Sequence, residues 1–445
     1  MKIIVVGAGI GGLRFAAKAA AAGHEVEVYE RAESLSSMRY DWHDDVSRAA
    51  FSGTGIAVPP GSFPKKNWSF VAPDGGIRRM YEDLSESDLS VWRGALNEEL
   101  AAAATDAGAK LHFGITVEGT ILADGRVRGV IAGGEKYADL VVDSTGVESR
   151  LKEGLDIDRP EKGEIFFAYR AFYEKDVSAP EAEHTNKVYL KHLGENGISW
   201  AIQDGDQVDV LIGRLGGLDK DTLENALNAL KADNPTIGKK ILSGGGVYKI
   251  PVRYPAARMT ASGYAAIGDA AYMTIPMLGS GIASSLAAAD MLFAIVNGAS
   301  KEGKSVRETV SKENLWRYEV EFFTRIGAEH AGVDLMKRSV LKMPDEELSW
   351  LLNSKVLTNA DICLLAKGKP IFITPASALQ KVVSGMRRLP LLMKVNAMLM
   401  KSHRAIRVAR SIPKKYDDGK INAWAEKLKA AVIGGRVCPV GRAKG

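Results

Sequence analysis

The chain has very few cysteines and little excess charge of either sign. Only Cys363 and Cys438 occur among its 445 residues, without a CxxC pair or neighbouring histidines. This scarcity argues against a disulfide framework and against a zinc site, and it fits a reducing compartment. The formal net charge is +5, which is too small to indicate nucleic-acid binding. No internal repeat or low-complexity segment is present.

The chain also lacks the patterns that direct a protein into or across a membrane. Its first residues, MKIIVVGAG, enter a strand at once, without the charged, apolar and small-residue regions of a signal peptide. No uncharged apolar stretch reaches the length of a membrane span. The sequence therefore predicts a cytoplasmic protein, and a length of 445 residues favours two or three domains.

The N-terminal stretch has the pattern of a dinucleotide-binding unit. Residues 2–6 predict a buried strand, GAGIGG a glycine turn, LRFAAKAAAAG a helix of small residues, and HEVEVYE a second strand. Gly7 permits the tight turn, Gly9 allows a pyrophosphate to approach, and Gly12 lets helix and strand pack closely. Glu30 lies where a carboxylate can accept hydrogen bonds from a ribose diol. A glycine turn that serves only packing is the alternative interpretation.

A second glycine-rich helix start lies far along the chain, within residues 263–292. The strand YAAI leads to Gly268 and Asp269, and the GSGI run at 279–282 then opens an alanine-rich helix. In a flavin site such an aspartate can hold a ribityl hydroxyl, while the helix amides face the pyrimidine end of the isoalloxazine. The alternative is an ordinary strand–turn–helix with Asp269 as a cap, although Asp269 stands far before the helix.

The rest of the sequence favours FAD over NAD as the dinucleotide. After Glu30 the regular alternation of strands and helices gives way to an irregular polar stretch, an arrangement that suits a protein wrapped around an extended FAD. We therefore expect an α/β fold built on a Rossmann-like FAD-binding domain with three layers (ββα). Its expected parts are residues 1–150 with an insertion near 40–87, a mainly antiparallel substrate sheet at 151–250, a return to the FAD-binding domain at 251–300, and a C-terminal helical region at 301–445.

Three segments resemble the para-hydroxybenzoate hydroxylase-like superfamily of FAD proteins: GAGIGG with Glu30, ADLVVDSTGVESR, and GDAA with the Pro and GSG that follow. Within it the chain looks most like the geranylgeranyl reductase family, because KIPVRYPAARMTASGYAAIGDAAYMTIPMLGSGI has that family's elements in the same order. The resemblance covers roughly residues 1–300, and it implies FAD as the cofactor. The cofactor-binding positions that it implies are Gly7, Gly9, Ile10, Gly11, Gly12, Glu30, Arg31, Arg93, Val117, Gly146, Gly268, Asp269, Pro276, Gly279, Gly281 and Ile282.

Two departures from these families bear on the substrate and on the electron donor. The family's substrate motif, aromatic-x-Trp-x-Phe-Pro followed by glycines, keeps Trp200 here, but Ile198 replaces the aromatic residue and Ile202 with Gln203 replaces Phe-Pro. Thr145 stands where the hydroxylases usually have an aspartate, so a hydroxylase-like NADPH site is not implied. The electron donor is therefore left open between NAD(P)H and a reduced ferredoxin-type carrier acting as a redox partner protein.

Candidate catalytic residues crowd into MRYDWHDDVSR, residues 38–48, where this fold passes toward the flavin. The catalytic candidates are Tyr40, His43 and Asp44, together with Trp200. His43 flanked by carboxylates can be a proton donor with a raised pKa. A solvated, charge-balanced loop is the alternative, and both interpretations stay open. A second set ranks lower, because strands usually place such groups outward or in a satisfied network: His184, Tyr189 and His192.

We expect an FAD-dependent oxidoreductase that reduces a carbon–carbon double bond of an apolar, isoprenoid-like lipid by hydride transfer from flavin N5. The alternatives are an FAD-dependent monooxygenase and a non-catalytic FAD-containing lipid-binding protein. Residues 381–415 hold ten Lys and Arg with no Asp or Glu, interleaved with Leu and Met. Such a stretch can lie on an anionic membrane at its cytoplasmic face. The alternative is a helix hairpin packed on the protein with its lysines in water. No metal site and no nucleic-acid partner are expected.

Overall fold

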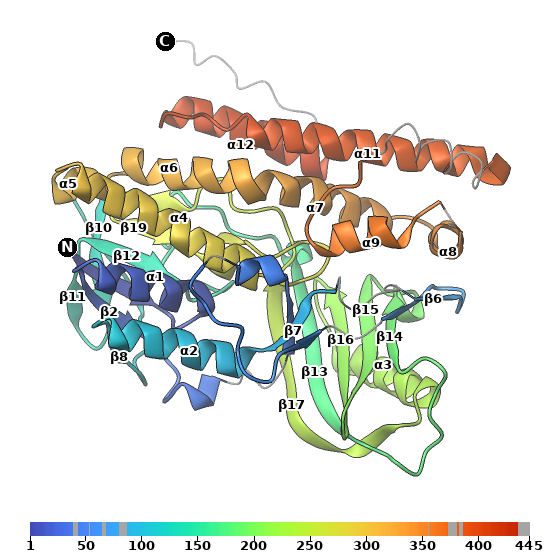
Figure 1. Ribbon diagram of the computed structural model, residues 1–445. Coiled ribbons are helices and arrows are strands. Elements are labelled where there is room, and N and C mark those ends of the chain that lie inside the picture. Colours follow the sequence, from blue (N-terminus) through green and yellow to red (C-terminus); the bar gives the residue numbers. More distant parts are fainter. Residues whose placement is uncertain are drawn as a thin grey trace.

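The computed structural model describes residues 1–38, 43–52, 54–64, 68–79, 87–354, 356–372, 381 and 386–434. Within these residues the chain forms a Rossmann-like domain, a large mostly antiparallel sheet and a layer of helices (Figure 1). The α/β fold class and the helical C-terminal region predicted from the sequence are confirmed.

The Rossmann-like domain is built on a six-stranded sheet in the order β18-β19-β12-β1-β2-β8. All neighbouring pairs are parallel except β18 with β19. The strands are β1 (Lys2–Val6), β2 (Glu25–Tyr29), β8 (Lys110–His112), β12 (Leu140–Asp143), β18 (Thr260–Ala261) and β19 (Tyr264–Ala266). The helices α1 (Ile10–Ala21), α2 (Arg93–Asp106) and α4 (Ile282–Lys301) pack beside it, α1 lying against both others. A three-stranded sheet of β9 (Gly119–Ala123), β10 (Arg126–Ile131) and β11 (Glu135–Tyr137) packs against β12 as a further layer.

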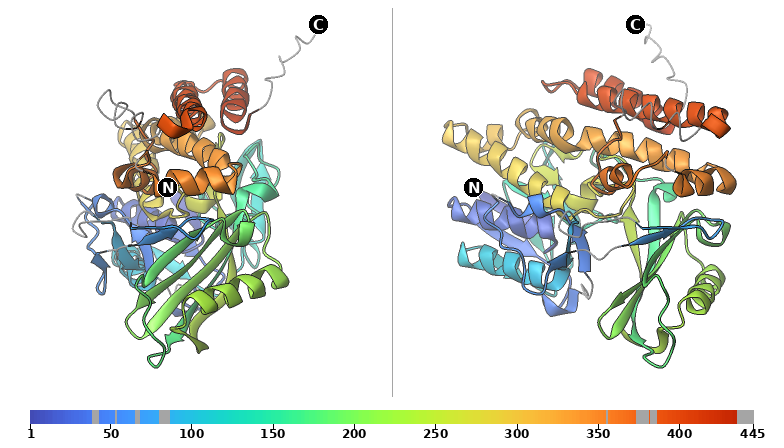
Figure 2. Two further views of the ribbon diagram at one scale, coloured as in Figure 1. Left: turned by 90° about the vertical axis from the view of Figure 1, so that its right-hand side faces the viewer. Right: turned by 45° about the vertical axis from the view of Figure 1, so that its right-hand side comes forward.

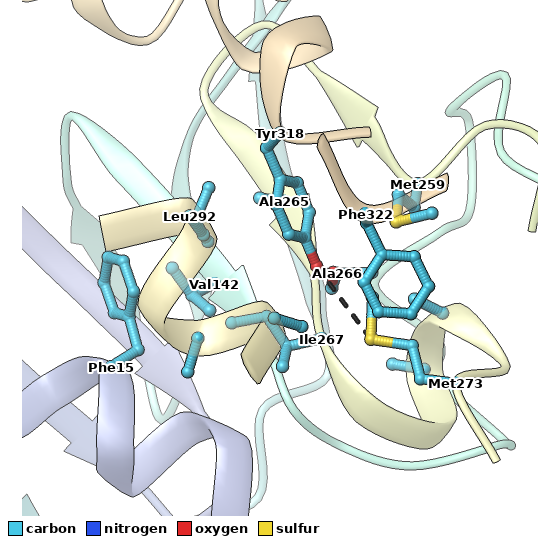
Figure 3. Close-up of a cluster of buried hydrophobic side chains, with 14 of the residues drawn as sticks. Phe15, Val142, Met259, Ala265, Ala266, Ile267, Met273, Leu292, Tyr318 and Phe322 are labelled. Atoms are coloured by element: carbon cyan, nitrogen blue, oxygen red, sulfur yellow. Dashed lines mark hydrogen bonds between the residues drawn. The ribbon is translucent and has the colours of Figure 1, made fainter. Parts of the chain in front are cut away.

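The interior of this domain is a continuous apolar layer that joins segments far apart in the sequence. Figure 3 shows Phe15 of α1, Val142 of β12 and Leu292 of α4 on one side of it. Tyr318 lies on the other side, and its hydroxyl donates a hydrogen bond to the carbonyl of Ala266 at 3.1 Å. Small side chains on β19 let the C-terminal helices pack directly onto the strand that leads to Gly268 and Asp269.

The second sheet has seven strands in the order β17-β13-β16-β15-β14-β5-β6. They are β5 (Ser69–Val71), β6 (Ile77–Arg79), β13 (Ile165–Lys175), β14 (Asn186–Leu190), β15 (Gly197–Asp204), β16 (Gln207–Leu215) and β17 (Ile237–Pro251). The expected sheet of residues 151–250 therefore gains two strands from the insertion that precedes α2. These strands have only three residues each, too few for an alternating pattern to be recognised.

The two faces of the large sheet have different neighbours because side chains alternate along each strand. Tyr169 and Tyr173 of β13 face α3 (Lys220–Asp233), which covers the outer surface. Arg170 and Phe172 of the same strand line a cavity on the inner surface. A small sheet of β3 (His43–Val46), β7 (Leu89–Trp92) and β4 (Phe63–Pro64) also contributes to this cavity.

The C-terminal region is a stack of helices on the side of the molecule away from α3 (Figure 2). It comprises α5 (Val306–Thr309), α6 (Lys312–Phe322), the π-helical turn η7 (Phe323–Gly327), α7 (Ala328–Leu341), α8 (Asp345–Asn353), α9 (Asn359–Ala366), α11 (Leu389–Arg410) and α12 (Asp418–Ile433). α11 and α12 form the outermost layer. α11 packs on α7, and α8 and α9 lie beneath the end of α11 where Leu389 begins it.

Helix α4 is long and apolar enough to cross a membrane by length and composition alone. It is not an uncharged stretch, because Asp290 lies near its middle, so the expectation drawn from the sequence is not contradicted. α4 is instead a core helix, since it packs on α1 and α6 and over half of its apolar window is buried. Its Asp290 also pairs with Arg14 at 2.8 Å and with Lys18 at 3.1 Å. A core helix passes the same test as a membrane span.

The contact between α7 and α11 depends on Gly332. A Cβ atom at this position would lie 2.6 Å from Cγ1 of Ile406 and 2.9 Å from Oγ of Ser402. We expect Gly332→Val to lower the free energy of unfolding by about 1–3 kcal/mol, because α11 must move away from α7. Urea denaturation checks this value. Gly298→Ala is the matched control, since Gly298 lies in α4 with open space around it; equal losses in both variants would contradict the prediction.

Candidate active site

One cavity of about 1550 Å³ lies between the Rossmann-like domain, the inner face of the large sheet and the helices α7, α8 and α9. All of the expected cofactor-binding residues except Gly12 line it. His43, Asp44 and Trp200 line it as well, whereas Tyr40 lies outside the described residues. Residues from four separate stretches of the chain therefore meet at one cavity.

The first glycine turn is held against the end of β12. Gly7 has φ +90°, and a Cβ there would lie 2.5 Å from the carbonyl oxygen of Ser144. A Cβ on Gly12 would lie 2.7 Å from the carbonyl oxygen of Gly7, and its amide donates a hydrogen bond to Oγ of Ser144 at 3.2 Å. Gly12 is therefore a packing glycine. Gly9 is the N-cap of α1, whose first amides have no intrahelical acceptor and face the cavity end.

Glu30 closes the adenosine end of the expected cofactor site. Its two carboxylate oxygens accept hydrogen bonds from the amides of Ala8 at 2.8 Å and Ala32 at 2.9 Å. These bonds fix the carboxylate at the end of β2 while each oxygen keeps a further lone pair. The side chain is buried and lines the cavity, so its position suits hydrogen bonding to a diol.

Asp143 organises the segment DSTG, and sequence reasoning did not identify this role. The carboxylate is fully buried and accepts hydrogen bonds from the hydroxyl of Tyr264 at 2.6 Å and from the amide and hydroxyl of Thr145 at 3.0 and 2.7 Å. Thr145 donates to Oδ1, whereas the hydroxyl of Ser149 donates at 2.5 Å to Oδ2, the oxygen that also accepts from Tyr264. A buried carboxylate is stable only with such partners, so Asp143 fixes the turn that carries Ser144 and Gly146.

The second glycine segment lines the same cavity and lies beside the start of α1, since a Cβ on Gly11 would be 2.5 Å from Cγ2 of Ile267. Gly268 and Asp269 lie in a short 3-10 turn, η6 (Gly268–Ala271), and Gly281 is the N-cap of α4. Oδ1 of Asp269 accepts a hydrogen bond from the hydroxyl of Thr274 at 2.8 Å. Asp269 makes no cap bond to α4, which removes the capping interpretation. Burial raises the pKa of Asp269, with opposing effects from the bond to Thr274 and the charge of Arg93.

His43 differs electrostatically from what the sequence suggested. Its Nδ1 lies 3.8 Å from Oδ2 of Asp204, and its ring contacts Phe63 with 5.2 Å between centroids. Burial lowers the pKa of His43, and this effect outweighs the charge of Asp204, which acts in the opposite direction. The expectation of a raised pKa is therefore wrong. A charge-balanced sequence does not reveal that the imidazole is desolvated.

Two pairs of charged side chains, Arg93 with Asp44 and Arg170 with Asp209, line the cavity near His43, and we call them the ionic seam. Nη1 of Arg93, at the head of α2, lies 3.5 Å from Oδ2 of Asp44. Arg170 of β13 donates two hydrogen bonds to Asp209 of β16, at 3.1 and 2.8 Å. Sequence reasoning missed Arg170 and Asp209. Their only signal is that both occupy cavity-facing positions on strands that otherwise place apolar side chains there.

Beyond this seam the cavity is an apolar chamber. Trp200 lies in it beside Trp68, with 5.7 Å between ring centroids. Its walls come from the large sheet, from the loop before α4 and from the helical layer. Members of these walls are Phe70, Val188, Leu190, Ile198, Ile202, Leu211, Met277, Val340, Leu348, Leu352, Leu357, Ile362 and Leu365.

The lower-ranked polar set belongs to the outer face of the large sheet. Tyr189 and Lys187 bind Asp233 at the end of α3, Lys187 at 2.7 Å. His192 bonds to Oγ of Ser199 at 2.9 Å, and burial lowers the pKa of His192 to about 4. His184 lies 3.3 Å from Oγ of Ser69. None of these groups lines the cavity, so they fasten α3 and the strands together.

Comparisons with known proteins agree with this arrangement. A family model described as an NAD(P)-binding Rossmann-like domain matches residues 5–62. A digeranylgeranylglycerophospholipid reductase from Sulfolobus acidocaldarius is 22% identical over 80% of this chain and 80% of its own length. A solved geranylgeranyl bacteriochlorophyll reductase-like protein from Thermoplasma acidophilum superposes with a TM-score of 0.71 at 19% identity, covering 89% of this chain and 98% of its own. The chain is thus similar to geranylgeranyl reductases over most of its length. The resemblance stated from its motifs is thereby confirmed.

The geranylgeranyl reductase-like fold is shared with flavin enzymes of other reaction types. The p-nitrophenol 4-monooxygenase of Pseudomonas putida superposes with a TM-score of 0.58 at 17% identity, over 82% of this chain and 97% of its own. Such a likeness concerns the fold alone. Together the relatives support the predicted class, an FAD-dependent oxidoreductase, while the individual site residues stay predictions.

The packing at Gly12 gives a direct test of the cofactor site. We expect Gly12→Ala to raise the Kd for FAD at least tenfold, about 1.4 kcal/mol, because the new methyl group pushes α1 away from Gly7 and Ser144. Fluorescence titration of deflavinated protein measures this constant. Gly119→Ala, with open space around the position, should bind FAD as the unaltered protein does. An unchanged Kd for Gly12→Ala would contradict the assignment.

Proposed function

We propose that this chain is an FAD-dependent oxidoreductase that reduces a carbon–carbon double bond of an apolar, isoprenoid-like lipid. The observation that carries the proposal is that one cavity runs from the glycine turns into an apolar chamber. Its volume of about 1550 Å³ exceeds the roughly 300–1,000 Å³ of ordinary small-molecule sites, so a second ligand has room beside a cofactor.

The cofactor proposal rests on the donor groups that converge at the glycine end. The carboxylate of Glu30 suits a ribose diol, and the free amides of α1 suit a pyrophosphate. Asp269 suits a ribityl hydroxyl, and the start of α4 suits the ring edge that becomes negative on reduction. Bound FAD supplies the hydride for reduction of a double bond.

We propose that His43, Asp44 and Arg93 orient the ligands and exclude water from the cavity. None of the three is proposed to supply a strong acid. Burial lowers the pKa of His43, so near neutral pH the ring is mostly uncharged and seldom carries the extra proton to donate, and Asp44 pairs with Arg93. We therefore propose that the proton for the second carbon comes from water or another weak donor, and that Trp200 positions the substrate. Tyr40 stays a candidate outside the described residues.

The substrate class is inferred from the chamber and from the relatives together. The chamber walls are aliphatic and aromatic, so they favour a hydrocarbon chain over a polar substrate. Several relatives carry the name digeranylgeranylglycerophospholipid reductase, which supports an isoprenoid lipid for this chain also. The electron donor is proposed to be NAD(P)H or a reduced ferredoxin-type carrier.

Anaerobic reoxidation tests the reaction type. The FAD-loaded protein is reduced under argon, and a polyprenyl alkene is added. We expect the oxidised flavin spectrum to return with formation of a saturated product, and we expect Ile198→Trp, which fills the chamber, to slow this at least tenfold. Val177→Trp is the control, since Val177 is 86% exposed.

Two other outcomes would replace the proposal. A C4a-peroxide absorbance on addition of air, with an oxygenated product and no reaction under argon, would identify a monooxygenase. A reduced flavin that is not reoxidised by alkenes, and that yields no oxygenated substrate in air, would indicate a binding role without turnover.

We also propose that α11 rests on an anionic membrane at its cytoplasmic face. Leu389, Met393 and Met400 are spaced by four and seven residues, which puts them on one helix face, and they are 54%, 67% and 57% exposed. Arg404 and Arg407 continue that side of the helix and are exposed. Apolar tips beside basic groups match an interfacial helix on anionic lipid. Residues 382–385 of the predicted stretch 381–415 lie outside the described residues.

Vesicle flotation tests the membrane proposal without any enzymatic readout. At physiological salt the protein should partition at least tenfold more strongly into vesicles with anionic phospholipid than into neutral ones. Met393→Asp should abolish this, and each loss of a basic group, as in Arg404→Ala, should weaken partitioning about fivefold. Val177→Asp is the control at an exposed site on the large-sheet side. Failure of the unaltered protein to float even at low salt would remove the proposal.

A further inference from the structure

Arg170 is a charged side chain placed deep between the large sheet and the Rossmann-like domain. Only 11% of its side chain and 9% of that of Asp209 are exposed. Nε and Nη2 donate to the two carboxylate oxygens of Asp209 at 3.1 and 2.8 Å. A buried pair of this kind is tolerated only with such two-point geometry, and it gives a fixed direction to the remaining guanidinium hydrogens.

One of those hydrogens reaches out of the sheet. Nη2 of Arg170 also donates to the carbonyl oxygen of His43 at 2.9 Å. His43 is the first residue of β3, and the two residues after it, Asp44 and Asp45, contact the start of α2 and the loop before α4, which are both expected to bind the flavin. Asp44 pairs with Arg93 at the head of α2 at 3.5 Å, and the carbonyl of Asp45 accepts a hydrogen bond from Oγ of Ser280 at 2.8 Å.

Three consecutive residues of β3 therefore contact three separate parts of the molecule. These parts are the substrate sheet, the start of α2 and the loop that opens α4. β3 is itself a short strand, paired along one edge with β7 from His43–Trp92 to Val46–Leu89. Such a strand keeps its pairing when a side contact is lost, but its position relative to the large sheet is then held only by weaker contacts, such as that of His43 Nδ1 with Asp204 at 3.8 Å.

We infer that Arg170 is a positioning residue that holds β3, and through it Arg93 and Ser280, in register with the substrate chamber. The inference rests on the proposed function in one respect, namely that these two segments hold FAD. The guanidinium carbon also lies 5.3 Å from the ring of Trp200 and 5.4 Å from that of Phe172. The group that fixes β3 is thus in contact with the chamber wall that a substrate touches.

The chemistry of the contact demands arginine. A lysine ammonium is a single point charge and cannot make the two-point contact with Asp209 while also reaching His43. Arg170→Lys should therefore keep the charge and lose the link to β3, whereas Arg170→Met should lose both. Arg214 offers a matched control in the same sheet. It is buried, it donates to the carbonyls of Ile198 and Gly213 at 3.1 and 2.9 Å, and it does not line the cavity.

Amide hydrogen exchange of the full chain, with and without FAD, tests the inference. In Arg170→Met and Arg170→Lys we expect exchange in residues 43–46 and 279–282 to speed at least tenfold, including without FAD. We also expect the Arg170 variants to have a Kd for FAD at least tenfold higher than that of the unaltered protein. When FAD is bound to them, the visible circular dichroism of the flavin should be altered. Arg214→Met should lower Tm without changing these segments or the flavin spectrum.

The outcomes separate this inference from the proposed function. Unchanged exchange in both segments of the Arg170 variants would overturn the inference whatever the protein binds. Equal acceleration in Arg214→Met would also overturn it, because the effect would then be a general loss of stability. If no variant, nor the unaltered chain, binds FAD, the proposed function fails, while the exchange result still decides the role of Arg170.

Discussion

The site depends on a backbone contact that only glycine permits, between the turn after β1 and the end of β12. Gly7 and Gly12 leave no room for a Cβ beside Ser144, and Ser144 is held there because the neighbouring Asp143 is anchored by Tyr264 and Thr145. Tyr264 belongs to β19, the strand that leads into the second glycine segment. Since β1, β12 and β19 are neighbouring parallel strands, their carboxyl ends meet at one edge of the sheet, where ligands of such folds bind. One buried carboxylate thus ties together three segments that are far apart in the sequence.

The parts that sequence could predict are those with a local physical signature. The glycine turn at residues 7–12, the position of Glu30 and the helix start at 279–282 each require particular residue types at fixed spacing, so they could be identified without a structure. Arg170 and Asp209 have no such signature, because their partnership is formed across two strands and looks in sequence like ordinary alternation. The pKa of His43 was misjudged for a related reason. Its carboxylate neighbours are visible in the sequence, but the desolvation that outweighs them arises only from packing.

The chamber explains why the family's substrate motif can be degenerate here without loss of the site. Ile198 and Ile202 stand where the family has aromatic side chains, and both still line the chamber on β15. What the wall requires is apolar surface on alternate positions of the strand, which isoleucine supplies as well as phenylalanine does. Identity at these positions therefore tunes the shape of the chamber, whereas its apolar character follows from the alternation of the strand.

The position of α8 connects the chamber with the outermost helix. Leu348 and Leu352 of α8 line the chamber, while Leu351 of the same helix packs with Leu391 of α11. Residues three and four positions apart share one face of a helix, so these three leucines form one apolar stripe on α8, and the same stripe borders the chamber and contacts the helix that carries the exposed Met393. A water-soluble substrate would gain nothing from this arrangement. The proposed lipid substrate and the proposed membrane contact of α11 agree with each other, because packing through α8 joins the apolar wall of the chamber to the helix with the exposed apolar side chains.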